Sequence, residues 1–143
     1  MTYRNILVAY DGSALSDKAL DTAIELSKRS GANLEIVHVH KLPNLVLGEA
    51  YIPASPDLFE AAYKEAERIA ERARERLRSQ SANGNVQIIE GQPAYTIVEF
   101  ARNRQCDLIV IGSRGLSGLK ELVLGSVSHN VVQQSHVPVL VVK

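Results

Sequence analysis

The chain has 143 residues, enough for a single domain that buries one hydrophobic core. Its 16 basic and 16 acidic residues cancel, so no bulk charge favours nucleic acid or an anionic membrane as a partner. A single cysteine, Cys106, excludes an intramolecular disulfide and a cysteine-based zinc cluster, and a reducing cytoplasm fits best. The longest apolar runs are about five residues, far short of the ~20 that cross a bilayer, and no secretory signal is recognisable.

The first third of the chain predicts a strand, a helix and a second strand. Residues 6–10 form a buried apolar run, which Asp11-Gly12-Ser13 ends with residues typical of turns and helix caps. Apolar positions then recur on one face of a helix over about residues 16–30, and Gly31 supplies the stop. Residues 33–40 alternate in part and predict the second strand.

Polar residues at the ends of these two strands are candidates for a site. Asp11 lies at the C-terminal end of the first strand, where open α/β sheets bind ligands, although it can equally cap the next helix. His38 and His40 are two apart and share one face of a strand, as a metal pair would. Because no carboxylate or third histidine stands at ligand spacing beside them, packing or hydrogen bonding is the favoured role, and no metal ligands are predicted.

The middle of the chain predicts a long loop and a long helix. Residues 41–56 hold three prolines and one glycine, which preclude a long regular element. The apolar residues of this loop predict a flap that packs over the cleft or against a partner chain, although simple packing on its own domain explains them equally well. Residues 57–80 predict the strongest helix, with a solvated face of paired charges. A turn at 81–85, a third strand at 86–90 and a helix from Pro93 to about Arg104 follow.

The most informative stretch runs from Cys106 to Ser128. A buried strand at 107–111 breaks into Gly112-Ser113-Arg114-Gly115, and nine residues later Gly125-Ser126-Val127-Ser128 precede a helix over about 126–135. A strand, a glycine turn and a helix N-terminus together make a scaffold for phosphate. Ser126 and Ser128 either cap the helix or donate hydroxyls to phosphate oxygens, and Arg114 offers a planar fork. Alternatively, the glycines only satisfy turn geometry.

The spacing Gly112-x2-Gly115-x9-Gly125-Ser126 resembles the nucleotide-binding motif of the universal stress protein family, without gap or substitution. The resemblance extends to residues 4–13 and 137–142, and therefore to the whole chain, residues 1–143, as one domain of this family. It implies an α/β fold with an open, parallel, five-stranded sheet of order 3-2-1-4-5 and helices on both faces. This architecture is Rossmann-like and similar to that of the adenine nucleotide alpha hydrolases.

The resemblance also implies a function. It implies a cytoplasmic stress-response protein that binds ATP, with Mg²⁺ or Mn²⁺ bridging the phosphates. Any hydrolysis of ATP should be slow, because no residue stands out as a base to activate water. The resemblance implies a homodimer through the apolar edge strand at 137–142, while the balanced charge predicts neither nucleic acid nor membrane as a partner. Asp11, Val39 and Ile111 would surround adenosine, although Val39 is nearly as well explained as an ordinary core valine; Ala9 stands where some nucleotide-binding members carry proline. The implied binding residues are Ala9, Asp11, Val39, Ile111, Gly112, Arg114, Gly115, Gly125, Ser126, Val127 and Ser128.

No catalytic residue stands out. No serine, histidine and acid are spaced as a triad, and Cys106 is better explained as a buried residue than as a nucleophile. His129 and Lys120 either reach the ligand or are solvated. Two alternatives stay open: a nucleotide-using enzyme, such as an ATPase or adenylyl transferase, and a dimeric interaction module whose glycine turn is only structural.

Overall fold

Strands and helices alternate along the chain in the computed structural model, which describes residues 2–41, 44–47, 50–53, 55–114 and 124–143. The elements of this part of the chain are β1 (Asn5–Ala9), α1 (Ala14–Ser30), β2 (Asn33–His40), β3 (Asn44–Leu47), β4 (Ala50–Pro53), α2 (Pro56–Ser79), β5 (Asn85–Glu90), α3 (Pro93–Asn103), β6 (Leu108–Gly112), α4 (Ser126–Gln134) and β7 (Val139–Val142).

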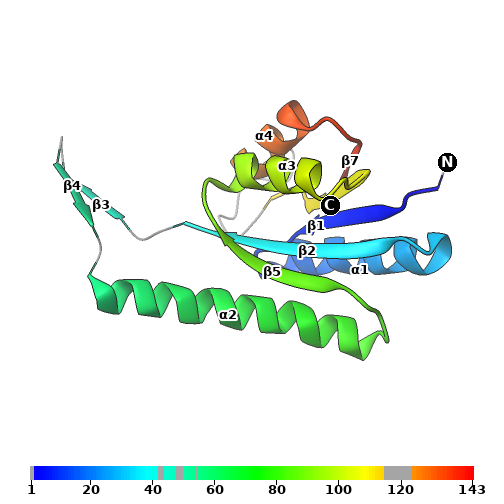
Figure 1. The fold of residues 1–143 in the computed structure, drawn as a ribbon, viewed down its shortest axis with the longest axis horizontal. Helices are drawn as coiled ribbons and strands as arrows, with labels where there is room; N and C mark the ends of the chain where they lie inside the picture. Colours follow the sequence, from blue (N-terminus) through cyan, green and yellow to red (C-terminus); the bar gives the residue numbers. More distant parts are fainter. Residues whose placement is uncertain (1, 42–43, 48–49, 54, 115–123) are drawn as a thin grey trace.

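Five of these strands form one parallel sheet in the order β5-β2-β1-β6-β7 (Figure 1). The central strand β1 pairs with β2, Ala9 lying opposite Val37, and with β6, Val8 lying opposite Val110. Because β3 and β4 lie outside this sheet, β5 is its third strand along the chain, and the expected order 3-2-1-4-5 is confirmed. The switch in strand order falls between β1 and β6, so a crevice is expected beyond the C-terminal ends of these strands.

Helices cover both faces of the sheet and create two hydrophobic cores. Side chains alternate along β1, so Ile6 and Val8 pack with α1 and α2, while Leu7 and Ala9 pack with α3 and α4. Ile109 and Val110 divide in the same way on β6. Figure 1 shows α3 and α4 on the opposite side of the sheet from α2. A parallel sheet buried on both faces explains the nearly continuous apolar runs in the sequence.

The prediction that residues 41–56 form a loop without regular structure is wrong, because this stretch contains an antiparallel hairpin of β3 and β4. Each strand has only four residues, and Pro53 ends the second. The hairpin stands apart from the main sheet, between the end of β2 and the start of α2 (Figure 1). What the flap covers depends on side chains outside the described residues.

Helix ends follow the capping signals of the sequence. Ser13 is the N-cap of α1, and Gly31 ends this helix in the left-handed conformation with φ +76°. Ser55 caps α2 before Pro56. Among the described residues, no helix is both long enough and apolar enough to span a membrane.

Candidate functional site

A cavity of about 300 Å³ opens at the C-terminal ends of β1 and β6, where the topology predicts a ligand site. It lies within the range of small-molecule pockets, at the lower end. Every predicted binding residue in the described part of the chain lines it; Gly115 lies outside the described residues. The predicted residues in its wall are Ala9, Asp11, Val39, Ile111, Gly112, Arg114, Gly125, Ser126, Val127 and Ser128.

One end of the cavity is apolar. Val37 and Val39 come from β2, Ile111 from β6 and Ile97 from α3, so side chains from three elements enclose the same space. Val37 and Ile111 are buried. Such a wall suits the faces of a flat aromatic ring, which lose contact with water when they enter it.

Gly112 lets α1 approach the end of β6. A Cβ at this position would lie 3.0 Å from Cβ of Leu15 and 3.1 Å from its backbone carbon. Backbone cannot move aside as easily as the end of a side chain, so any larger residue would push α1 and β6 apart. This close approach brings the first turn of α1 to the end of β6, and the cavity wall includes residues near the starts of both α1 and α4.

The turn that leads into α1 forms one edge of the cavity, and Asp11 makes this edge acidic. Oδ1 of Asp11 accepts the backbone N–H of Ser13 at 2.9 Å. The Ser13 hydroxyl oxygen accepts the N–H of Ser16 at 3.1 Å, and the Ser16 hydroxyl donates to the Ser13 carbonyl at 2.9 Å. Asp11 therefore supports the turn before the helix and lines the cavity, but the N-cap of α1 is Ser13, so the alternative that Asp11 caps this helix is wrong.

The first turn of α4 forms the opposite edge. Its N-cap is Gly125, without a side-chain capping bond, so the expectation that Ser126 caps the helix is wrong. Ser126 is instead the first helical residue and is exposed at the cavity. Within the described residues, the first hydrogen bond of this helix runs from the His129 N–H to the Gly125 carbonyl at 2.9 Å. The amides of Ser126, Val127 and Ser128 precede it, and such first-turn N–H groups are the ones that bind anions.

Ser128 has a structural role that the sequence pattern did not distinguish from phosphate binding. Its hydroxyl is buried and lies within donating distance of two carbonyls, Ser113 at 2.8 Å and Gly125 at 3.1 Å. The Ser113 carbonyl also accepts the Gly125 N–H at 2.8 Å, and the Ser113 N–H donates to Val142 of β7 at 2.8 Å. Ser113 thus joins the end of β6, the start of α4 and the last strand.

Gly125 leaves little space for a side chain. A Cβ here would lie 3.3 Å from the Cα of Arg114 and 3.6 Å from Oγ of Ser128. The two ends of the connection between β6 and α4 therefore approach each other closely, and Arg114 stands at the same edge of the cavity as the first-turn amides. An arginine beside unpaired N–H groups is an arrangement suited to phosphate oxygens.

The two histidines of β2 lie on the α2 side of the sheet. Nδ1 of His38 is 2.9 Å from the Tyr10 carbonyl, which can only accept, so Nδ1 carries the proton. Burial lowers the pKa of His38 below its ordinary value, and the ring is therefore neutral near pH 7. In the described part of the chain, no three histidine, cysteine or acidic side chains gather as a metal site.

Two further candidates lie away from the cavity. His129 is exposed and is not part of the cavity wall, while Lys120 lies outside the described residues. Cys106 precedes β6 at the other end of the sheet and is buried, which raises its thiol pKa to about 11.

Six residues of the cavity wall were not predicted from the sequence. Val37 carried a usable signal, because it lies two positions before Val39 and therefore faces the same side of β2. Ile97 lies within the predicted helix that begins at Pro93, but nothing in the sequence showed which strand ends that helix would reach. The residues missed are Tyr10, Ser13, Ser16, Val37, Pro93 and Ile97.

Comparisons with known proteins agree over the whole chain. A family model described as the universal stress protein family matches residues 2–143. The universal stress protein YxiE of Bacillus subtilis is 40% identical over 147 residues, covering 99% of each chain.

Solved structures share the fold. A universal stress protein in complex with cAMP is 28% identical, with a TM-score of 0.75 over 100% of this chain and 99% of the other. A universal stress protein from Archaeoglobus fulgidus in complex with dAMP is 27% identical, with a TM-score of 0.73 over 100% of both chains.

Proposed function

The chain belongs to the universal stress protein family, and on this premise we propose that it is a regulatory protein that binds ATP in the cavity between β1, β6, α1 and α4. The base would lie against the apolar wall of Val37, Val39 and Ile111, with Asp11 at the ribose or base edge. The phosphates would lie on the first turn of α4, beside Gly112, Arg114 and the glycine turn. The complexes of two similar proteins with cAMP and dAMP support an adenine nucleotide as the ligand.

One observation carries this proposal. The cavity combines an apolar wall with three first-turn amides of α4, next to Gly112, where a side chain would push α1 and β6 apart. An apolar wall alone would suit many small molecules, whereas the helix N-terminus adds a preference for an anion. A nucleotide has both parts, a flat base and a phosphate chain, in one molecule.

The residues present fit a divalent cation that is held mainly by the nucleotide. Asp11 is the only carboxylate in the cavity wall of the described residues, and Mg²⁺ commonly takes one or two carboxylates together with substrate phosphates. Mg²⁺ or Mn²⁺ would neutralise part of the phosphate charge when it is bound. The described wall contains no histidine to activate water, and we expect hydrolysis to be slow at most.

The cellular setting follows from the same premise. We place the protein in the cytoplasm as a stress-response homodimer that pairs through β7, the edge strand of the sheet. A nucleotide-independent interaction module remains the competing function, and it predicts that changes to the phosphate edge of the cavity leave the protein's behaviour unaltered.

Calorimetric titration with ATP and Mg²⁺ tests the proposal, with Ser126→Glu as the decisive variant. A carboxylate at the first residue of α4 suits the helix dipole but repels phosphates at the cavity edge. We expect ATP affinity to fall about tenfold or more, from charge repulsion at close range. Adenosine, which lacks phosphates, should bind the variant as it binds the wild type.

Gln133→Glu is the matched control, because it adds the same charge to an exposed position at the far end of the same helix. It should leave ATP affinity near the wild-type value. Mass analysis of small molecules released from freshly purified protein adds an independent readout. A wild-type protein that releases no adenine nucleotide and shows no binding at millimolar ATP would favour the interaction module instead.

A further inference from the structure

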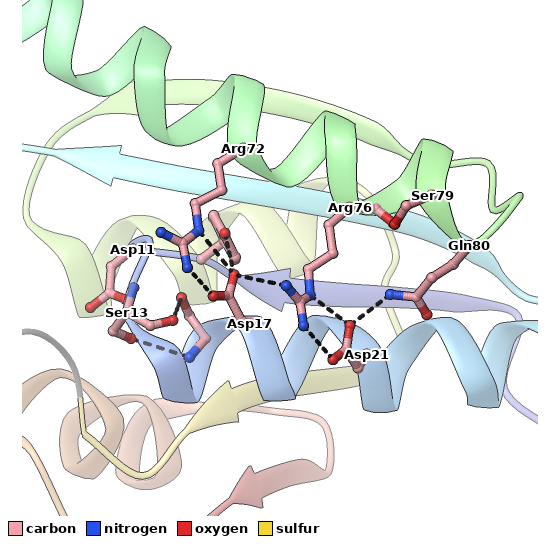
Figure 2. Close-up of polar contacts among 10 residues, drawn as sticks. Asp11, Ser13, Asp17, Asp21, Arg72, Arg76, Ser79 and Gln80 are labelled. Carbon is pink, nitrogen blue, oxygen red and sulfur yellow. Dashed lines mark hydrogen bonds and ion pairs between the residues drawn. The ribbon is translucent and has the colours of Figure 1, made fainter.

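Two carboxylates of α1 face two arginines of α2, one helical turn apart (Figure 2). Arg72 donates to Asp17 through both Nε and Nη2, and Arg76 donates to Asp21 at 2.7 and 2.8 Å. The amide of Gln80 adds a third donor to Asp21 at 2.7 Å. These pairs join two helices that lie on the same face of the sheet.

The two pairs differ in burial. The side chain of Asp17 is 9% exposed, whereas that of Asp21 is 38% exposed. A buried carboxylate depends on its hydrogen-bond donors, because water does not replace any that is lost. Asp21 can turn to solvent, although its hydrogen bond with Arg76 holds its carboxyl pKa below the usual range.

Only Asp17 is connected to the cavity. It accepts the hydroxyl of Tyr10 at 2.5 Å, and Tyr10 is both a wall residue of the cavity and the neighbour of Asp11. Burial and then the hydrogen bond to Asp17 raise the pKa of Tyr10 well above its ordinary value, so the hydroxyl stays protonated and donates.

Tyr10 is held at three points. Its N–H donates to the Val37 carbonyl at 2.9 Å, its carbonyl accepts from His38 at 2.9 Å, and its hydroxyl reaches Asp17. The first two contacts bind the end of β1 to β2. The third links it to α1 and, through Arg72, to α2.

We propose that Tyr10, Asp17 and Arg72 form a positioning network that sets the acidic edge of the cavity and links nucleotide affinity to the docking of α2. This proposal rests on the function proposed above and names the path by which α2 responds to the ligand. Asp17 does not touch the ligand; it acts through Tyr10 on Asp11 and through Arg72 on α2. Since linkage is reciprocal, loosening the Asp17 contacts weakens nucleotide binding, and bound nucleotide tightens α2.

The test compares Asp17→Asn with Asp21→Asn. Both substitutions remove one carboxylate charge from α1 and weaken its pairing with the arginines of α2, and Asp17 lies 3.9 Å from Arg76 as well as beside Arg72. Only Asp17→Asn disturbs Tyr10. We expect Asp17→Asn to raise the Kd for MgATP about fivefold or more, a size typical of coupled sites. Asp21→Asn should change it within about twofold, because a solvent-exposed pair contributes little.

Hydrogen exchange measured by mass spectrometry gives a second readout. If Asp17 had only a structural role, nucleotide binding would not change the exchange of α2. In the wild type, MgATP should slow exchange in the middle turns of α2, around Arg72, as well as at the cavity. In Asp17→Asn at saturating MgATP, we expect protection at the cavity but not in α2. Asp21→Asn should keep both responses.

Tyr10→Phe keeps the proposal falsifiable if Asp17→Asn fails to fold. It removes only the hydroxyl and keeps the buried ring, and it should raise the Kd and abolish the α2 response in the same way. Equal Kd values in wild type and Tyr10→Phe, with the α2 response intact, overturn the network while leaving ATP binding established. No MgATP binding by the wild type overturns both proposals.

Discussion

His38 shows how burial of one titratable side chain links stability to pH. Its ring is neutral in the folded protein, because burial lowers its pKa by more than the hydrogen bond to the Tyr10 carbonyl raises it. The titratable groups that influence it are His40 on the same strand, Asp11 after β1 and Glu65 on α2. In the unfolded chain the pKa returns to about 6.5.

The sign of the effect follows from these two states. Above about pH 6.5 the ring is neutral whether folded or unfolded, and its full contribution to stability is present. As the pH falls from there through the lowered pKa of the folded state, the unfolded chain binds the proton first, so stability is lost. We expect the urea midpoint of the wild type to fall between pH 7 and pH 5 more steeply than that of His38→Gln. Parallel curves for the two proteins would contradict this prediction.

The site residues that could be predicted share one property: each lies at a strand end, in a glycine turn or in the first turn of the helix that follows it. Asp11 and Gly112 follow buried strands directly, so topology alone brings them together. Tyr10 lies at the end of its strand too, but a tyrosine there signals only a core residue. Its importance comes from a hydrogen bond to Asp17, seven positions away on the next element, which neither periodicity nor spacing reveals.

At the scale of elements, the closure of the connection between β6 and α4 depends on Ser128. Its buried hydroxyl donates to the Ser113 carbonyl, which also receives the Gly125 N–H. Ser128→Ala should therefore lower the free energy of unfolding by about 1 kcal/mol, the usual value of one hydrogen bond. Urea denaturation measures this difference directly.

Ser126→Ala serves as the comparison, since this hydroxyl is exposed two residues earlier on the same helix. It should alter stability by about 0.5 kcal/mol or less. If Ser128 instead served only as a phosphate ligand, Ser128→Ala would weaken ATP binding and leave the unfolding free energy unchanged. That result would remove the structural role assigned to this hydroxyl.

Element boundaries were predictable where local chemistry sets them. β2 was predicted with its observed bounds, and Gly31 ends α1 as expected, because a left-handed residue stops a helix whatever surrounds it. The hairpin of β3 and β4 was missed because two four-residue strands leave no periodicity that outweighs three prolines and one glycine. The start of α4 at Ser126 was predicted, but the N-cap is Gly125 and not Ser126, since glycine and serine are both accepted at that position.

At the scale of the whole molecule, the sheet order could be anticipated from alternation and from the family resemblance together. Alternating strands and helices require a parallel sheet with crossovers, but many strand orders satisfy that pattern. The resemblance selected 3-2-1-4-5, and the observed order of the strands in the described sheet confirms it. The contacts between α1 and α2 could not be predicted from the sequence. The charged pattern of residues 57–80 is the same whether its arginines are solvated or bind Asp17.

The same sheet order leaves β7 with one paired side and one open side. It pairs with β6 along Val139–Val142, while its other edge has no partner within the described chain. Leu140 is 37% exposed and Val132 of α4 is 43% exposed, so apolar surface accompanies the open edge. An apolar edge strand associates readily with a second strand, and two copies of β7 can pair across a twofold axis.

We therefore expect the wild type to sediment as a dimer, at about twice the 15.6 kDa mass of one chain. Leu140→Lys places a charge on the open edge, a device by which proteins prevent strand pairing, and should shift the population to monomer. Leu58→Lys puts the same charge on a leucine of α2 that is 48% exposed, and it should remain dimeric. A monomeric wild type, or a Leu140→Lys variant as dimeric as Leu58→Lys, would show that β7 is not the surface through which copies of this chain associate.

If ATP still bound to a monomeric Leu140→Lys protein with unchanged affinity, each cavity would be complete within one chain, as its wall residues predict.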